Sequence, residues 1–97
     1  MDKAWADSVK QEDHFTCQVC HKKPKPAGCH AHHIIPRMYK ETRWNTKNGI
    51  CLCFKCHKVG KNSAHQNAIW FSLWLYRNKP LTFAWVRKEL NALNREK

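Results

Sequence analysis

The sequence has few acidic residues and lacks any long apolar run. Seven Asp and Glu stand against eighteen Lys and Arg among 97 residues, which gives a formal net charge of +11. The richest apolar stretch, residues 68–76, is far shorter than the roughly eighteen residues expected of a membrane-spanning helix. We therefore expect no membrane partner.

A secretory signal is lacking as well. Residues 1–11 are polar and acidic apart from Ala4, Trp5, Ala6 and Val9, so they do not contain the apolar segment of a signal peptide. Six cysteines in a short secreted chain would suggest a disulfide scaffold. Without a signal, we expect a cytoplasmic protein whose reduced thiols hold metal.

The positive charge is concentrated in the middle of the chain. Residues 21–61 carry ten basic side chains and a single acid, Glu41, whereas residues 1–20 carry four acids and two lysines. A phosphate backbone is the natural partner of such a field. The alternative is a basic surface that only keeps the protein soluble.

Length and pattern predict a single small α+β domain over residues 1–97. A chain of this size builds a thin core, which a structural metal would help to stabilise. Apolar spacing predicts helices at 3–13, 53–59, 63–78 and 82–94 and two antiparallel strands at 29–35 and 50–52, and prolines and a glycine predict a basic loop at 22–28.

The predicted helices also have expected roles. Residues 3–13 are expected to cover the cysteine module, and Asn62 or Ser63 is expected to cap the third helix. Its apolar stripe, Trp70, Leu73 and Trp74, is widened by Phe71 and Leu75. The stripe follows helical spacing and is more typical of a core than of a base-stacking surface.

Two Cys-x-x-Cys pairs predict a structural zinc site. Cys17 and Cys20 form the first pair, and Cys53 and Cys56 form the second. Two thiolates separated by two residues can bind one tetrahedral ion from a single tight turn. A redox Cys-x-x-Cys motif would explain only one of the pairs. The zinc would close a long loop between them.

Histidines on a predicted strand and on the following predicted helix are placed to form a second metal site, in which one of His32 and His33 can face the metal while the other faces the cleft. His32 and His33 are adjacent on a predicted strand, so their side chains leave it on different sides. His57 lies on the following predicted helix, beside the cysteines. Imidazoles from one strand and one helix are typical of an open metal site.

The remaining cysteines and several histidines are expected to have no such role. Cys29 and Cys51 lie on the predicted strands among small or apolar neighbours, and we expect buried free thiols there. His14, His21 and His30 are expected at the surface.

The segment Ala31-His32-His33-Ile34-Ile35-Pro36, followed by Asn48 and then by Cys53-x-x-Cys56-His57, resembles the HNH endonuclease family. The similarity covers about residues 13–65. It implies a ββα-metal core of the branch with a four-cysteine zinc, common among phage-encoded proteins, flanked by an N-terminal helix and by C-terminal helices over 63–97.

This resemblance implies roles for the residues of the motif. His33 would be the general base that takes a proton from the attacking water. His32, where many members have Asp, and His57 would bind a catalytic divalent ion. Asn48 would orient the strand and the His33 ring by hydrogen bonds. Family members leave 5′-phosphate and 3′-hydroxyl ends.

Several details stay open at this point. His65 could be a third ligand or a histidine at a helix start near the cleft. With His32 in place of Asp, the nitrogen-rich site binds Mg²⁺ weakly compared with Mn²⁺, Ni²⁺ or Zn²⁺. Arg37 could clamp a phosphate or be a solvated surface residue. The wider set of basic residues expected to contact DNA is Arg37, Lys40, Arg43, Lys47, Lys58 and Lys61.

The resulting hypothesis is a metal-dependent DNA endonuclease of low intrinsic sequence specificity. The alternative is a zinc-knuckle module that binds nucleic acid without catalysis, but such a module needs no set of histidines beside an asparagine. By analogy, phage DNA-packaging proteins are candidate partners. We expect a monomer or a weak dimer, acting in the host cytoplasm if the protein is phage-encoded.

Overall fold

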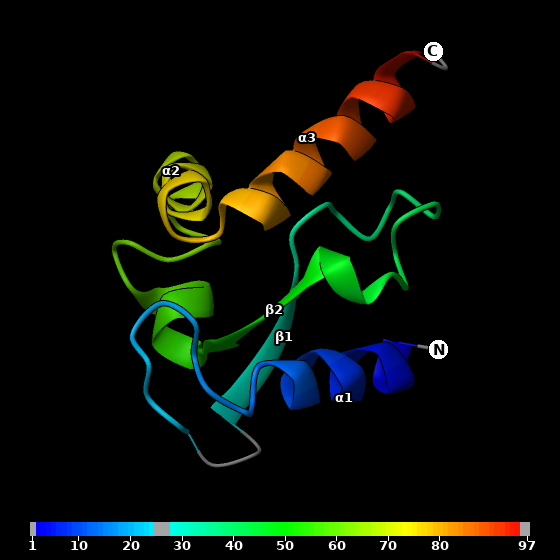
Figure 1. Ribbon diagram of the computed structural model, residues 1–97. Coiled ribbons are helices and arrows are strands. Elements are labelled where there is room, and N and C mark those ends of the chain that lie inside the picture. Colours follow the sequence, from blue (N-terminus) through cyan, green and yellow to red (C-terminus); the bar gives the residue numbers. More distant parts are fainter. Residues whose placement is uncertain (1, 25–27, 96–97) are drawn as a thin grey trace.

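The computed structural model describes residues 2–24 and 28–95 and has the expected α+β architecture (Figure 1). Residues 25–27 of the predicted basic loop lie outside the described residues. The elements in chain order are α1 (Asp2–Glu12), β1 (Cys29–His33), the 3-10 helix η2 (Thr46–Asn48), β2 (Gly49–Cys53), the π-helix η3 (Lys55–Val59), α2 (Ala68–Asn78) and α3 (Pro80–Arg95).

The two strands pair antiparallel, as predicted, and present two different faces. His32 lies opposite Ile50, and His33 lies opposite Gly49. Because successive side chains of a strand alternate, His32 and Ile50 share one face, whereas His33 and Gly49 share the other. In Figure 1, α1 lies on one side of the strands, and α2 and α3 lie on the other.

Helix α1 packs on the face of the sheet that carries His33. Trp5 and Val9, four residues apart on one side of the helix, are buried. They lie directly over Gly49, where an added Cβ would collide with Val9 and lie 2.8 Å from Trp5 Cζ2. The expectation that this helix covers the cysteine module is therefore wrong, because its apolar side chains pack on the strands.

The opposite face of the sheet packs against α2. Ile50 and Leu52 join Phe71 and Leu75 in one buried cluster that also includes Cys17, Cys56 and Ala64. Trp70 and Trp74 pack against this cluster, but Leu73 is 51% exposed. The predicted core stripe is thus wrong at Leu73, whereas Phe71 and Leu75, which were predicted to widen the stripe, are buried against the sheet.

Helix α2 begins five residues later than predicted. Asn67 is its N-cap, and the Asn67 side chain accepts a hydrogen bond from Trp70 N. Ser63 instead stabilises a turn, in which its Oγ accepts from Gln66 N at 3.2 Å. A cap at Asn62 or Ser63 is therefore wrong, because the residues after Gly60 fold back on η3 before a new helix starts.

Cys29 and Cys51 are buried, as expected, but they are not free thiols. The structure joins them in a disulfide with a Cα–Cα distance of 6.5 Å. Cys29 pairs with Cys53 and Ala31 pairs with Cys51, so the two cysteines are diagonal neighbours on one face of the sheet. The register, which sequence spacing does not give, brings them together.

The C-terminal part forms a helical pair. The sequence predicts that Pro80 stops the preceding helix, and α2 does end just before it, at Asn78. Pro80 is the first residue of α3, consistent with the preference of proline for the first turn of a helix. Phe83 at the start of α3 packs against the apolar cluster. In the described residues, no helix is long and apolar enough to cross a membrane.

Candidate active site

The four knuckle cysteines converge, as predicted from their spacing. Cys17, Cys20, Cys53 and Cys56 place their sulfur atoms within 4.8 Å of one another. The Sγ atoms of Cys20 and Cys53 are 3.7 Å apart. Four thiolates at 2.3 Å from a tetrahedral zinc would be separated by about 3.8 Å. The sulfur positions therefore fit one zinc ion.

The protonation of these thiols also fits a bound cation. Burial acts to raise the pKa of Cys17, but hydrogen bonds from the backbone of Cys20, Cys53 and Val19 lower it to about 7. Burial raises the pKa of Cys56 far above its usual range, and the neighbouring sulfur atoms raise it further. A bound cation would offset the repulsion between neighbouring sulfur atoms and favour their thiolate form.

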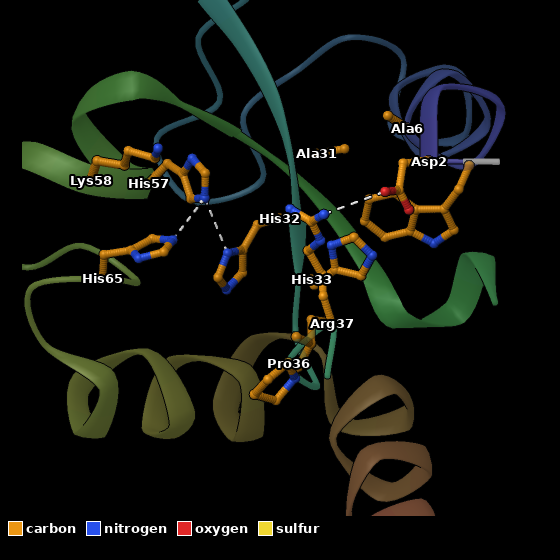
Figure 2. A pocket seen from close by; sticks show the side chains of 12 residues that line it. Asp2, Ala6, Ala31, His32, His33, Pro36, Arg37, His57, Lys58 and His65 are labelled. Carbon is orange, nitrogen blue, oxygen red and sulfur yellow. Dashed lines mark hydrogen bonds and ion pairs between the residues drawn. The ribbon is translucent and has the colours of Figure 1, made fainter. Parts of the chain in front are cut away.

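Three histidines from β1, η3 and the segment before α2 come together beside the cysteine site. His57 is buried on η3, and its Nε2 lies 3.1 Å from His32 Nδ1 and 3.1 Å from His65 Nε2. Figure 2 shows the rings of His32 and His65 pointing toward His57. His65 precedes α2 and is not a helix-start residue, because the fold-back of residues 60–66 carries it to η3.

This arrangement of nitrogens fits a metal better than it fits hydrogen bonds alone. A neutral imidazole has only one N–H group, so His57 Nε2 cannot donate to both neighbours. Nitrogens at 2.0–2.1 Å from a tetrahedral ion would be about 3.3 Å apart, close to the observed separations of 3.1 Å. One divalent cation would satisfy the three lone pairs together.

The electrostatics keep these imidazoles available as ligands. Burial, followed by the charges of His57 and His65, lowers the pKa of His32 to about 3. Burial, followed by the neighbouring His65, lowers the pKa of His57 to about 4. Both rings are therefore neutral near pH 7, the form that binds metal.

His33 lies on the opposite face of β1 and is held by two contacts. Its ring stacks on Trp5 at a centroid distance of 3.7 Å and an interplanar angle of 9°. Its Nε2 lies 2.9 Å from the carbonyl oxygen of Arg43. That oxygen can only accept, so Nε2 donates to it, and in the neutral ring Nδ1 is left as the basic nitrogen.

Asn48 is fully buried and fixes the segment after β1. Its Oδ1 accepts from Ile35 N at 2.6 Å, and its Nδ2 donates to Ile35 O and to Thr42 O. Asn48 thus holds the segment that follows β1 in place. Asn48 has no hydrogen bond to the His33 ring in the described structure. It instead binds the carbonyl of Thr42, and the carbonyl of the next residue, Arg43, accepts a hydrogen bond from His33.

Of the six predicted DNA-binding residues, two line a cleft, three lysines lie outside it, and Arg43 is ion-paired with Asp2. Arg37 and Lys58 line a cleft of about 550 Å³ together with the histidines His32, His33, His57 and His65. Lys40, Lys47 and Lys61 are exposed but do not line that cleft.

Asp2 binds both arginines of the predicted DNA-binding set. Arg43 is ion-paired with Asp2 at 2.7 Å, and Arg37 is 3.5 Å from the same carboxylate. Figure 2 shows Asp2 beside Arg37 at the rim of the cleft. The hydrogen bond from Arg43 holds the pKa of Asp2 well below its usual range.

Sequence reasoning missed two histidine contacts at this site. His30 was expected at the surface, yet its Nδ1 lies 2.9 Å from His57 Nδ1. The signal was present, because His30 and His32 are two apart on a strand and so share a face. The stacking of Trp5 on His33 had no comparable signal, since it depends on the docking of α1.

Comparison with known families agrees with this geometry. Residues 17–59 match the family described as HNH endonuclease, and this segment includes both cysteine pairs, the two strands and η3. Neither the comparison with curated proteins nor that with solved structures gives a significant match. The family indicates nuclease activity in general, with DNA as the implied substrate. The segment from Cys17 to Val59, with the metal-ligand geometry described above, therefore matches the HNH endonuclease family, the family that the sequence motif resembles.

Proposed function

We propose that this protein is a metal-dependent DNA endonuclease that hydrolyses phosphodiester bonds and leaves 5′-phosphate and 3′-hydroxyl ends. The single observation that carries the proposal is that one strand places a basic nitrogen, that of His33, next in sequence to a proposed metal ligand, His32. β1 presents His33 on one face and His32 on the other, and both line the same cleft.

In this proposal, His33 is the general base. Its Nδ1 accepts a proton from the attacking water, while the Nε2 hydrogen bond to the Arg43 carbonyl and the Trp5 ring fix its orientation. Burial lowers the pKa of His33, so the ring is neutral and able to accept a proton near pH 7. Asn48 maintains the loop that supplies the Arg43 carbonyl.

His32, His57 and His65 would hold the catalytic ion, and the four cysteines would hold a structural zinc. When bound, a divalent ion supplies Lewis-acid stabilisation of the charge that develops on the phosphate and on the leaving 3′ oxygen. A set of three imidazoles favours Mn²⁺, Ni²⁺ or Zn²⁺ over Mg²⁺. Arg37 and Lys58 at the cleft are the best placed of the basic residues to bind backbone phosphates.

Wider aspects of the proposal rest on composition and resemblance. Residues 1–97 would act as one nuclease domain, because one apolar cluster joins the cysteine knuckle, β2 and α2. Its intrinsic sequence specificity would be low. Lys40, Arg43, Lys47 and Lys61 would extend the contact with DNA. A phage origin, packaging proteins as partners, a monomer or weak dimer and a cytoplasmic location remain parts of the hypothesis.

The experiment that tests the proposal is cleavage of supercoiled plasmid by the His33→Ala variant across a series of divalent metals. We expect a loss of about 10²–10⁴-fold in rate with every metal, because the loss of a general base costs that much. Zinc content by elemental analysis and DNA affinity by fluorescence anisotropy should stay close to those of the wild type, because His33 is not expected to bind either.

The matched control is His14→Asn, which changes an exposed histidine outside the cleft. It should cut at the wild-type rate. A non-catalytic zinc-knuckle module would instead bind DNA without cutting it under any metal, and cleavage by His33→Ala at the wild-type rate would show that the assignment of the base is wrong.

A further inference from the structure

His57 has contacts on both of its ring nitrogens, and only one side can be the metal side. His57 Nε2 faces His32 and His65, whereas His57 Nδ1 faces His30 at 2.9 Å. The rings of His30 and His57 meet edge to face, with centroids 5.1 Å apart. His30 therefore approaches His57 from the side opposite to the ligand set.

We infer that His30 is a positioning residue that orients the metal ligand His57 by accepting a hydrogen bond from its Nδ1. This inference rests on the proposed metal site of His32, His57 and His65. An imidazole that binds a cation through Nε2 carries its hydrogen on Nδ1. The only partner that the described residues offer to this hydrogen is His30 Nδ1.

The contact defines the hydrogen positions of both rings. His57 Nδ1 donates and His30 Nδ1 accepts, so the hydrogen of a neutral His30 must be on Nε2. The His30 ring is itself held by an edge contact with Phe54, at a centroid distance of 5.8 Å. Because His30 lies on β1 and His57 on η3, the hydrogen bond joins the strand and the helix that together carry the ligands.

His30 is not itself a fourth ligand of the same ion. The three nitrogens that lie within 4.8 Å of one another belong to His32, His57 and His65. The lone pairs of the two nitrogens of an imidazole point away from each other, so an ion at His57 Nε2 is out of reach of a group bonded to Nδ1. His30 thus acts on the ion through His57.

Metal affinity measures this role without any need for cleavage. Protein with zinc already in the cysteine site is titrated with Ni²⁺ or Co²⁺ by calorimetry, in the wild type and in His30→Ala and His30→Asn. Loss of such an outer partner typically lowers metal affinity by about 10–100-fold, and we expect this for His30→Ala. In His30→Asn, the amide oxygen takes the place of Nδ1 as acceptor, and affinity should return to within about threefold of the wild type.

Two further variants serve as controls, one expected to weaken metal binding and one expected to leave it unchanged. His65→Ala removes a proposed ligand and should weaken binding at least as much as His30→Ala. His14→Asn makes the same chemical change at an exposed residue whose positive φ of 54° asparagine tolerates, and it should bind metal normally. Circular dichroism and zinc content check that each variant folds, and the hydrogen positions in the wild-type protein, described next, carry the test if His30→Ala does not fold.

Long-range ¹H–¹⁵N spectra of the protein with zinc in both sites give a second readout. We expect the hydrogen of His57 on Nδ1 and that of His30 on Nε2. A wild-type affinity in His30→Ala, an equal loss in His30→Asn and His30→Ala, or a hydrogen on His30 Nδ1 would each overturn the inference. Metal affinity that depends on His30 without any cleavage would support it while refuting the proposed nuclease function.

Discussion

At the scale of single residues, the environment of His33 determines how the proposed base works. The ring lies between Trp5, which stacks on it, and the Arg43 carbonyl, which accepts from Nε2. Arg43 is in turn held by Asp2, whose carboxylate also accepts from Trp44 Nε1 at 2.9 Å. The base is thus supported by α1 at two points, although the helix carries no residue of the family motif.

The pH dependence of cleavage should report this environment. Burial lowers the pKa of His33 below its ordinary value of 6.5, with the Arg43 carbonyl partly opposing the shift. The neutral ring is the active form, so activity is complete above the lowered pKa and is lost as pH falls through it. We therefore expect the acid limb of kcat/KM to have its midpoint below pH 6.5.

A fluorogenic oligonucleotide assay in Mn²⁺ or Ni²⁺ between pH 5 and 8 measures this limb. Trp5→Phe retains an aromatic ring and serves as the control, while Trp5→Ala exposes His33 and should move the midpoint upward. A wild-type midpoint above 6.5 would contradict the proposed role of burial.

At the scale of elements, the close approach of α1 to β2 decides how the sheet is covered. The backbone of Gly49 is extended, with φ −127° and ψ 150°, which any residue can adopt, so backbone conformation does not require a glycine at this position. The reason is space, because Val9 and Trp5 occupy the position where a Cβ would lie. A side chain at position 49 would push α1, and with it Trp5, away from His33.

Gly49→Ala should therefore destabilise the fold. Overpacking of this kind costs about 1–3 kcal/mol, and urea unfolding of the zinc-loaded protein measures it. Gly28→Ala is the matched control. Among the described residues, its Cβ would meet only Pro24 Cβ, at 3.3 Å, and the substitution should cost about 0.5 kcal/mol or less. Equal stability of Gly49→Ala and the wild type would mean that α1 is not held against β2 as the structure shows.

A second element matters for the metal site, namely the fold-back after Gly60. Ala64 N donates to Cys56 O and His65 N donates to His57 O, so this segment runs beside η3. These backbone bonds bring His65 next to His57, eight residues earlier in the chain. A continuous helix from Ser63 would have placed no such bonds there.

At the scale of the whole molecule, the cysteine site ties together distant parts of the chain. Cys17 and Cys20 precede β1, whereas Cys53 and Cys56 follow β2, so one ion would close a loop that contains His32, His33 and Asn48. Cys17 and Cys56 also belong to the apolar cluster with Leu52 and Phe71. Structural zinc and core packing would therefore stabilise the same region.

Removal of this zinc should unfold the protein. Binding free energy of a structural zinc is folding free energy in small domains, so Cys17→Ser is expected to lose the ion and the cooperative thermal transition. Elemental analysis and thermal melts by circular dichroism measure the two properties together. His65→Ala, which changes only the second site, should retain one zinc and a normal transition. A zinc-free Cys17→Ser protein that melts like the wild type would refute the structural role.

The sequence by itself determined the local and chemical features of this protein. The spacing of Cys17, Cys20, Cys53 and Cys56 predicts one tetrahedral site, and the alternation of His32 and His33 predicts side chains on opposite faces of a strand, because both depend on neighbours in the chain. Helix α1, both strands and the family were predicted for the same reason.

Only the tertiary structure decided which distant groups meet. The register of the two strands joins Cys29 to Cys51, the fold-back after Gly60 brings His65 to His57, and the docking of α1 stacks Trp5 on His33. Strand alternation places His30 on the same face as His32, but the contact of His30 with His57, 27 positions away, depends on how η3 packs against β1. These contacts depend on packing between elements, which periodicity and spacing along a chain do not specify.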